Sequence, residues 1–189
     1  IKQGVTEIVL VPLQLTHAID PDERVLGQAV KLRSIHPDLR IQVSRPIGPE
    51  VTLLTVLDQR LRSSLGAHRV LELDGLVLSS ARTGDVRGNA LLARRARQWS
   101  THHRLPCLTA VADGSGPSVS QAIQGLRAQG RCHIAVGSFF LTATELFHAQ
   151  AELAERAAQT TVELARKREQ QIRFQTHAAL PLPCETYAC

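Results

Sequence analysis

Short apolar runs alternate with stretches of helical period along most of the chain. Runs rich in β-branched residues predict strands at Glu7–Leu15, Arg40–Ser44, Gly75–Ser80, Cys107–Ala112 and His133–Leu141. Apolar positions three and four residues apart predict helices between them, at Asp22–Ser34, Val51–Leu65, Val86–Ser100 and Ser118–Gln129. Such alternation is typical of parallel sheets covered by helices on both faces. We therefore expect an α/β protein with doubly wound parallel sheets.

A sequence repeat predicts two related lobes. The segments "IVLVPLQLT" (Ile8–Thr16) and "IAVGSFFLT" (Ile134–Thr142) share an apolar run, a small or imino residue, an apolar pair and a final threonine. Such self-similarity is typical of a duplicated fold. We expect residues 1–66 to be the remainder of a first lobe that is incomplete in this chain, and 67–157 to be a second lobe. Residues 158–189 are expected to form a helical extension and an irregular tail.

Composition narrows the class of protein. The chain has 189 residues, 43% of them hydrophobic, which is enough for a core without disulfide or metal support. It has neither a membrane-length apolar run nor a signal peptide, so we expect a cytoplasmic protein with no membrane partner. A net charge of +5 suits a polyanion, but aromatic residues make up only 3% and no nucleic-acid motif is present. We expect no nucleic-acid partner, although charge alone keeps that alternative open.

Further expectations concern the state of the cysteines, the need for a cofactor and the N-terminus. Cys107, Cys132, Cys184 and Cys189 lack the paired spacing of a zinc site and are expected to be thiols. The chain has no Walker A loop and no dinucleotide fingerprint, so no organic cofactor or ATP is implied. The chain begins at Ile1 and contains no methionine, and we expect a longer translated product. The sequence leaves open whether the chain forms a homo-oligomer.

Three polar residues follow the first predicted strand: Thr16, His17 and Asp20. Open α/β sheets bind ligands at the carboxyl ends of their strands, where imidazole and carboxylate groups can hold a metal ion or a proton. Alternatively, His17 is an ordinary loop residue and Asp20 caps a helix that starts at Pro21. We take His17 as the better candidate for contact with metal or substrate, and Asp20 chiefly as a helix cap that is also a candidate ligand.

Two further groups of polar side chains have simpler explanations. Four residues of metal-ligand type lie where a helix leads into a strand: His102, His103, Cys107 and His133. That is the sheet edge opposite the expected site, so we expect no metal there. Three arginines lie beside apolar positions of one helix and are expected to form its solvated face: Arg94, Arg95 and Arg97.

Three collinear segments carry a resemblance to a known family. They are "VPLQLTHAIDPDERV", "SRPIGPEVTLLTVLDQRL" and "VLSSARTGDVRGNALLARRAR". The chain resembles the sirohydrochlorin cobaltochelatases and ferrochelatases, CbiX-like class II chelatases, from Val5 to Arg156. These lyases insert a divalent metal into a tetrapyrrole during cobalamin or sirohaem biosynthesis. The resemblance implies two chelatase-like lobes, with cobalt or iron and a tetrapyrrole as substrates.

The resemblance also implies roles for individual residues. The histidine that opens a family lobe falls on Ala81, so this lobe has no imidazole there. The family's second metal-site histidine falls nearest Asp20, or on His17 if the loop slips. His148 occupies roughly the equivalent place in the second lobe. The implied metal ligands are therefore His17, Asp20 and His148, and His17 is the candidate base.

Arginines at strand ends are candidate contacts for the tetrapyrrole carboxylates. The segment Ser79–Asn89 leaves a strand and enters a helix, whose N-terminal N–H groups can receive an anion. Arg82 and Arg87 add guanidinium groups, which bind carboxylates in a bidentate fork, and Arg45 has a similar position. The alternative is that Asp85 and Arg87 only pair with each other and cap the helix.

The sequence is therefore consistent with two functions. The first is a chelatase that inserts Co²⁺ or Fe²⁺ into a sirohydrochlorin-like tetrapyrrole. The second is a non-catalytic relative that binds tetrapyrrole or metal, because the histidine expected at Ala81 is absent.

Overall fold

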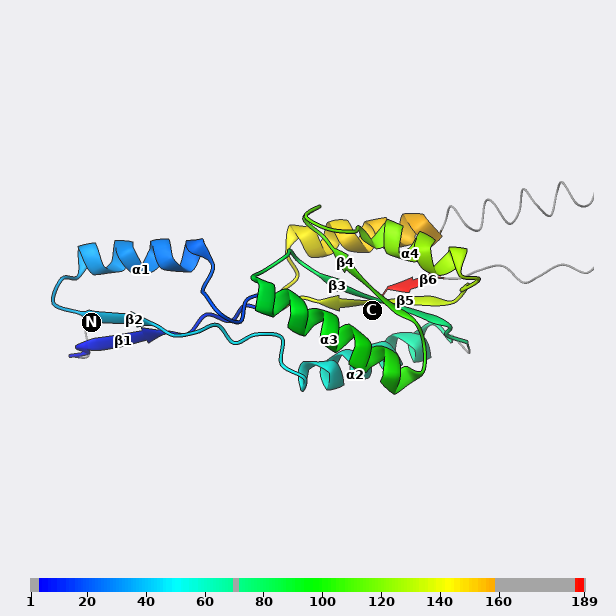
Figure 1. Ribbon diagram of the computed structural model, residues 1–189, viewed down its shortest axis with the longest axis horizontal. Coiled ribbons are helices and arrows are strands. Elements are labelled where there is room, and N and C mark those ends of the chain that lie inside the picture. The colour runs from blue at the N-terminus through cyan, green and yellow to red at the C-terminus, as the bar shows by residue number, and fades with distance from the viewer. Residues whose placement is uncertain (1–3, 70–71, 159–185, 189) are drawn as a thin grey trace, which may run out of the picture. The chain divides into compact units, whose positions relative to one another are not determined.

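A computed structural model describes residues 4–69, 72–158 and 186–188 (Figure 1). It confirms the α/β class, since helices alternate with strands that pair in parallel. The chain divides into two compact units, one formed by Ile1–Val51 with Thr83–Arg95 and the other by Thr52–Arg82 with Ala96–Cys189. The division into two related lobes remains a prediction. Most of the predicted extension and tail lies outside the described residues.

The first unit contains a strand, a helix and a second parallel strand. These are β1 (Glu7–Leu10), α1 (Glu23–Ile35) and β2 (Arg40–Val43). The helix packs on the sheet through Ala29, which is 1% exposed. The Arg33 guanidinium donates two hydrogen bonds, of 3.1 and 2.8 Å, to the Ile41 carbonyl and so ties α1 to β2.

Strand β1 is shorter than the predicted run Glu7–Leu15, and that boundary is corrected. It ends at Leu10, two residues before Pro12, whose nitrogen carries no hydrogen for a strand ladder. A single parallel bridge continues the pairing, between Leu13 and Ile47. The residues after Leu10 therefore form the connection to α1, and His17 lies inside it.

The second unit contains a four-stranded parallel sheet in the order β4-β3-β5-β6. The strands are β3 (Gly75–Ser80), β4 (Cys107–Val111), β5 (Ile134–Phe139) and β6 (Thr186–Ala188). The helices are α2 (Leu53–Ala67), α3 (Val86–His103, shared with the first unit), α4 (Val119–Ala128) and a further one described over 145–158. Helices α2 and α3 lie on one face of the sheet, and α4 and helix 145–158 on the other (Figure 1).

The core of the second unit is centred on β3, whose six residues are all buried. Val77 and Val136 point into an apolar cluster with α4 and with Ala154 of helix 145–158. On the other face, a Cβ added to Gly137 would lie 2.6 Å from the Trp99 ring. The absence of a side chain at Gly137 therefore lets helix α3 approach strand β5 closely.

Two expectations for individual side chains are wrong. Arg95 is not on a solvated face: it is 9% exposed, and its Nε donates a 2.6 Å hydrogen bond to the Pro49 carbonyl. A buried carbonyl thereby gains a partner, which explains why a cation is tolerated there.

The second wrong expectation concerns a cysteine: Cys132 is disulfide-bonded and is therefore not a thiol. Cys107 is a free thiol, and burial raises its pKa to about 12. Among the described residues, no helix is long and apolar enough to cross a membrane.

Candidate functional site

The connections after β1 and β2 bring three predicted site residues to one sheet edge. His17 and Asp20 follow β1, and Arg45 follows β2. The two strands are parallel, so their carboxyl ends lie at the same edge, where open α/β sheets bind ligands. Arg45 and Asp20 are exposed, and His17 is half-buried. This edge is the candidate site in the first unit.

The carboxylate of Asp85 holds the loop that follows His17. Its Oδ2 accepts hydrogen bonds from the backbone N–H groups of Ala18, Ile19 and Asp20, at 2.8, 2.7 and 3.3 Å. Its Oδ1 accepts one from the Gly88 N–H, at 2.6 Å, and so caps the start of α3. We call these four bonds the Asp85 clamp.

The Asp85 clamp explains the electrostatics of this carboxyl group. Burial alone would raise the pKa of Asp85, but the hydrogen bonds from Gly88, Ile19, Ala18 and Asp20 outweigh it and lower the pKa to about 2. Both carboxylate oxygens are engaged by the protein's own N–H groups. Asp85 therefore positions the loop and is not itself a candidate metal ligand.

Two glycines allow the loop to approach α3. A Cβ on Gly84 would lie 1.5 Å from the carbonyl oxygen of Thr16, and one on Gly88 would lie 1.9 Å from the same atom. Thr16 itself is 6% exposed. Since the obstacle is backbone, which cannot move aside cheaply, both positions require glycine while the loop keeps this path.

The surroundings of His17 leave part of its ring available. Its Nδ1 lies 3.4 Å from the Thr16 hydroxyl oxygen, and within the described residues no other hydrogen bond to the ring is found. The predicted cap at Asp20 is wrong. Helix α1 begins at Glu23, and Asp22 is its N-cap, with a 2.8 Å hydrogen bond from the Arg24 N–H to Oδ1. The Asp20 carboxylate is left exposed beside His17 in the chain.

The remaining predicted residues divide between the units. Arg87 is exposed in the first turn of α3, in the first unit, and forms no ion pair with Asp85 there. Arg82 follows β3 and His148 lies in the first turn of helix 145–158, both in the second unit. Their roles as substrate and metal contacts remain predictions.

In the second unit, Arg82 follows a strand beside the topological switch point. The chain passes from β3 to β4 on one side and then to β5 on the other, and ligands of open sheets bind at such points. Buried Gln150 links β3 to β5: it accepts a hydrogen bond from the hydroxyl of Ser79 in β3 and donates one of 2.9 Å to the hydroxyl of Ser138 in β5. This satisfied network fixes helix 145–158 on the sheet and offers no open ligand position.

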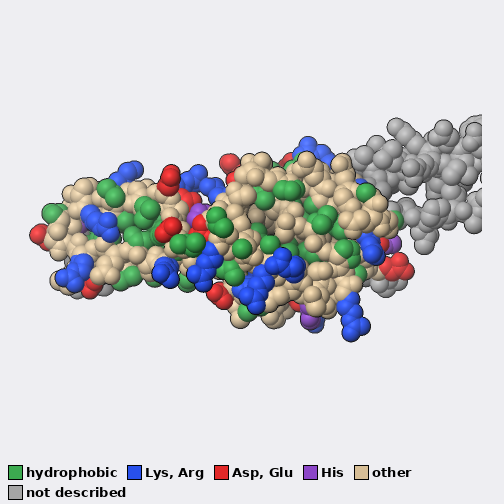
Figure 2. Space-filling model, in the orientation of Figure 1, with side chains coloured by type: hydrophobic (Ala, Val, Ile, Leu, Met, Phe, Trp, Pro, Cys, Tyr) green, Lys and Arg blue, Asp and Glu red, His purple; other side chains and the backbone are tan. Residues whose placement is uncertain are grey.

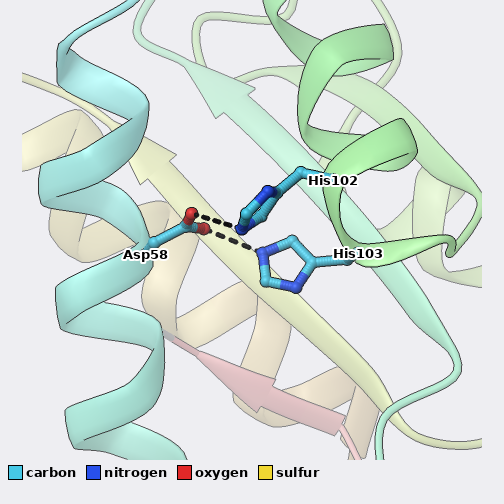
Figure 3. A group of neighbouring side chains, drawn as sticks. All are labelled: Asp58, His102 and His103. Atoms are coloured by element: carbon cyan, nitrogen blue, oxygen red, sulfur yellow. Dashed lines mark hydrogen bonds and ion pairs between the residues drawn. The ribbon is translucent and has the colours of Figure 1, made fainter.

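A second cluster of polar side chains joins α2 to the end of α3 (Figure 3). Asp58 of α2 faces His102 and His103 of α3, with 3.4 Å from Oδ2 to His102 Nε2 and 2.8 Å from Oδ1 to His103 Nε2. The Trp99 indole donates a 2.6 Å hydrogen bond to the same Oδ1. Burial raises the pKa of Asp58, but hydrogen bonds from His103 and Trp99, with the charges of both imidazoles, lower it overall.

Sequence reasoning rejected a metal at these histidines because they lie at the sheet edge opposite the expected site, and it did not pair them with Asp58. It ended the helix at Ser100 and so left both histidines in a loop, whereas α3 continues to His103. The helix ends in a Schellman pattern, with bonds from Leu105 N–H to Ser100 O and from Arg104 N–H to Thr101 O. Arg104 adopts φ 56°, a left-handed conformation that glycine usually takes, so the sequence lacked the glycine that most often marks such a helix end.

The basic residues do not form one continuous surface on the side that can be seen. Figure 2 shows Lys and Arg side chains spread over that face, with acidic and apolar side chains between them. A broad single-sign stripe is the usual footprint of nucleic-acid binding. The view therefore adds no support to the alternative that rested on net charge.

Comparison with known proteins gives one match. Residues 1–64 match the model of the CbiX family, a stretch that contains β1, α1, β2 and most of α2. No curated protein and no solved structure matched the chain. The match covers 64 of the 189 residues, and the resemblance described for the later segments is not part of it. It supports a relation of residues 1–64, including the loop with His17 and Asp20, to the CbiX chelatases.

Proposed function

We propose that this protein binds a sirohydrochlorin-like tetrapyrrole and inserts Co²⁺ or Fe²⁺ into it. One observation carries the proposal: the segment that matches the CbiX family contains the loop that brings His17 and Asp20 to the carboxyl edge of β1 and β2. Metal and macrocycle are both substrates in this reaction. No organic cofactor is needed.

The proposed chemistry assigns His17 two tasks. Insertion requires a ligand for the incoming ion and a base for the two pyrrole protons that it displaces. A half-buried imidazole can do either, and the Asp85 clamp holds the loop just after it. Asp20 is proposed as a second ligand, because its exposed carboxylate is not used as a helix cap.

The proposed substrate contacts are arginines that follow strands. Arg45 and Arg87 belong to the first unit and Arg82 to the second, and all three are proposed to bind tetrapyrrole carboxylates. His148 is proposed as a further metal ligand, in the second unit.

The rival function is binding without insertion. Ala81 stands where the resemblance places a lobe-opening histidine, so the second unit has no imidazole at that point. A protein that kept the macrocycle contacts but lacked a sufficient base would bind the tetrapyrrole and leave it metal-free. Binding and insertion must therefore be measured separately.

The experiment follows the visible absorption of sirohydrochlorin mixed with the full chain and Co²⁺. We expect the spectrum of the metallated macrocycle to develop, and the His17→Ala variant to be slower by roughly a hundredfold, the usual effect of losing a general base. Thermal stability should be nearly unchanged. The matched control is His36→Ala, a half-buried histidine at the end of α1 in the same unit.

Three results separate the alternatives. Spectral perturbation of sirohydrochlorin without metallation, at any Co²⁺ or Fe²⁺ concentration, would favour the non-catalytic relative. Absence of any tetrapyrrole binding would refute both functions. If His17→Ala unfolds the chain, the histidine is structural, and if the variant folds and reacts as fast as His36→Ala, the insertion site is elsewhere.

A further inference from the structure

Three metal-ligand side chains converge in the second unit, and none of them is used in the proposed insertion reaction. They are Asp58, His102 and His103, whose ligand atoms all lie within 4.8 Å of one another. We propose that they bind a divalent transition-metal ion of the zinc type. This site does not depend on the proposed chelatase function.

The spacing of the ligand atoms suits a small tetrahedral ion. Zinc lies about 2.0–2.1 Å from nitrogen and oxygen ligands, so neighbouring ligand atoms of a tetrahedral site are about 3.3 Å apart. The His102 Nε2 lies 3.4 Å from Asp58 Oδ2, which already matches. The His103 Nε2 lies 2.8 Å from the other carboxylate oxygen, Oδ1, and one ligand atom from each of the three residues lies within 4.8 Å of the others, so a modest movement of the His103 ring would bring it to an ion on Oδ2.

The side chain of Trp99 gives the carboxylate a fixed orientation. Its indole N–H donates to Oδ1 of Asp58, and the ring is 1% exposed, so it is held by the core. Groups that hydrogen-bond a ligating carboxylate fix its direction and strengthen metal binding. Oδ2 then remains for the ion, on the side where His102 stands (Figure 3).

Exposure provides both an entry path and a place for water. The His102 side chain is 58% exposed, whereas those of His103 and Asp58 are 20% and 14% exposed. An ion can enter beside His102, and water can complete a fourth position. Two imidazoles and one carboxylate favour Zn²⁺, Co²⁺ or Ni²⁺ over Mg²⁺ and Ca²⁺, which prefer oxygen ligands.

The simpler explanation is an ion pair at the end of a helix. Protonated histidines in the last turn of α3 would interact favourably with the helix dipole and with Asp58. That explanation accounts well for His103, which is partly buried and close to the carboxylate. It accounts poorly for His102, because an exposed ion pair gains little from fixing a mobile side chain.

The test uses Trp99, the only tryptophan in the chain, as the reporter. The untagged full chain is titrated with Co²⁺, a paramagnetic quencher, and with Zn²⁺ in competition, while Trp99 emission is recorded. We expect saturable quenching with one ion per chain, reversed by Zn²⁺ or a chelator. His102→Ala should weaken binding roughly tenfold or more without loss of folding, since this side chain is mostly exposed.

Two controls make the result specific. His68→Ala removes another exposed histidine, at the end of α2, and should leave the titration unchanged. His17→Ala should also leave it unchanged, which separates this site from the proposed insertion site. Absence of saturable quenching in the wild type would overturn the proposal, and so would equal affinity in His102→Ala. In either case the cluster is an ion pair only.

Discussion

Replacement of Asp85 by asparagine should cost about 1–2 kcal/mol of stability at neutral pH. The side chains have nearly the same shape, but the amide offers one acceptor oxygen, while the Asp85 clamp needs acceptors toward both Gly88 and the Ala18–Asp20 amides. The pKa of Asp85 is lowered from 3.8 to about 2. Each pKa unit corresponds to about 1.4 kcal/mol, so the shift sets an upper limit of about 2.4 kcal/mol, which solvent screening of this partly exposed carboxylate reduces to about 1–2 kcal/mol.

The same pKa shift sets the pH dependence. Because the folded pKa lies below the unfolded one, the stabilisation is fully present above about pH 5 and is lost as the pH falls toward 2. The difference between wild type and Asp85→Asn should therefore shrink to roughly half its neutral value at pH 3. The asparagine side chain does not ionise, so the loss of stability that accompanies protonation of Asp85 in the wild type should be absent from the variant.

Urea unfolding followed by circular dichroism, at pH 7 and at pH 3, measures both effects. Asp20→Asn is the matched control, because this carboxylate makes no hydrogen bond within the described residues, and a change below about 0.5 kcal/mol is expected. Hydrogen exchange should also accelerate at the Ala18, Ile19 and Asp20 amides in Asp85→Asn alone. Equal losses in the two variants, or a difference that stays constant between the two pH values, would refute the role given to the clamp.

Two further substitutions test the same region. Gly88→Ala should destabilise the folded chain by several kcal/mol, because the added Cβ would lie 1.9 Å from the Thr16 carbonyl oxygen. Gly27→Ala in α1 adds a Cβ that meets nothing within 4 Å, and it should stabilise the folded chain by about 0.5–1 kcal/mol. Thermal unfolding compares them, and a similar change in both would contradict the close approach. Asp22→Ala should cost about 1 kcal/mol through the lost cap, and Asp20→Ala much less, in urea unfolding. The reverse order would mean that α1 begins earlier.

The periodic pattern of the sequence predicted the elements because burial repeats regularly along helices and strands. Strand β3 occupies the residues predicted for it, and α4 differs from its prediction by one residue at each end. Strand β1 fell short because Pro12 interrupts the hydrogen-bond ladder, although the apolar run continues past it. Periodicity records where side chains are apolar, and backbone hydrogen bonding decides where a strand stops.

Pairs of residues far apart in the chain could not be predicted in this way. Asp85 lies 65 to 67 positions from the loop amides it binds. Its position at the start of a helix predicted a cap, but not these hydrogen bonds to the loop. Asp58 lies 45 positions from His103, on a different helix. Helical period shows that a helix has a buried face, but not which residues of another helix meet it, so neither arrangement could be read from a single sequence.

Both proposals involve divalent metals, and a crossed experiment separates them. His17 belongs to the first unit and His102 to the second, so each variant removes one imidazole and leaves the other unit intact. At a Co²⁺ concentration just sufficient to fill the wild-type cluster, His102→Ala should leave that cluster mostly empty, and in excess Co²⁺ it should metallate sirohydrochlorin at the wild-type rate. His17→Ala should keep the Trp99 quenching and lose the insertion. If His102→Ala also slows insertion when Co²⁺ is in excess, the histidine cluster takes part in the reaction, and the assumption that the two sites act independently is wrong.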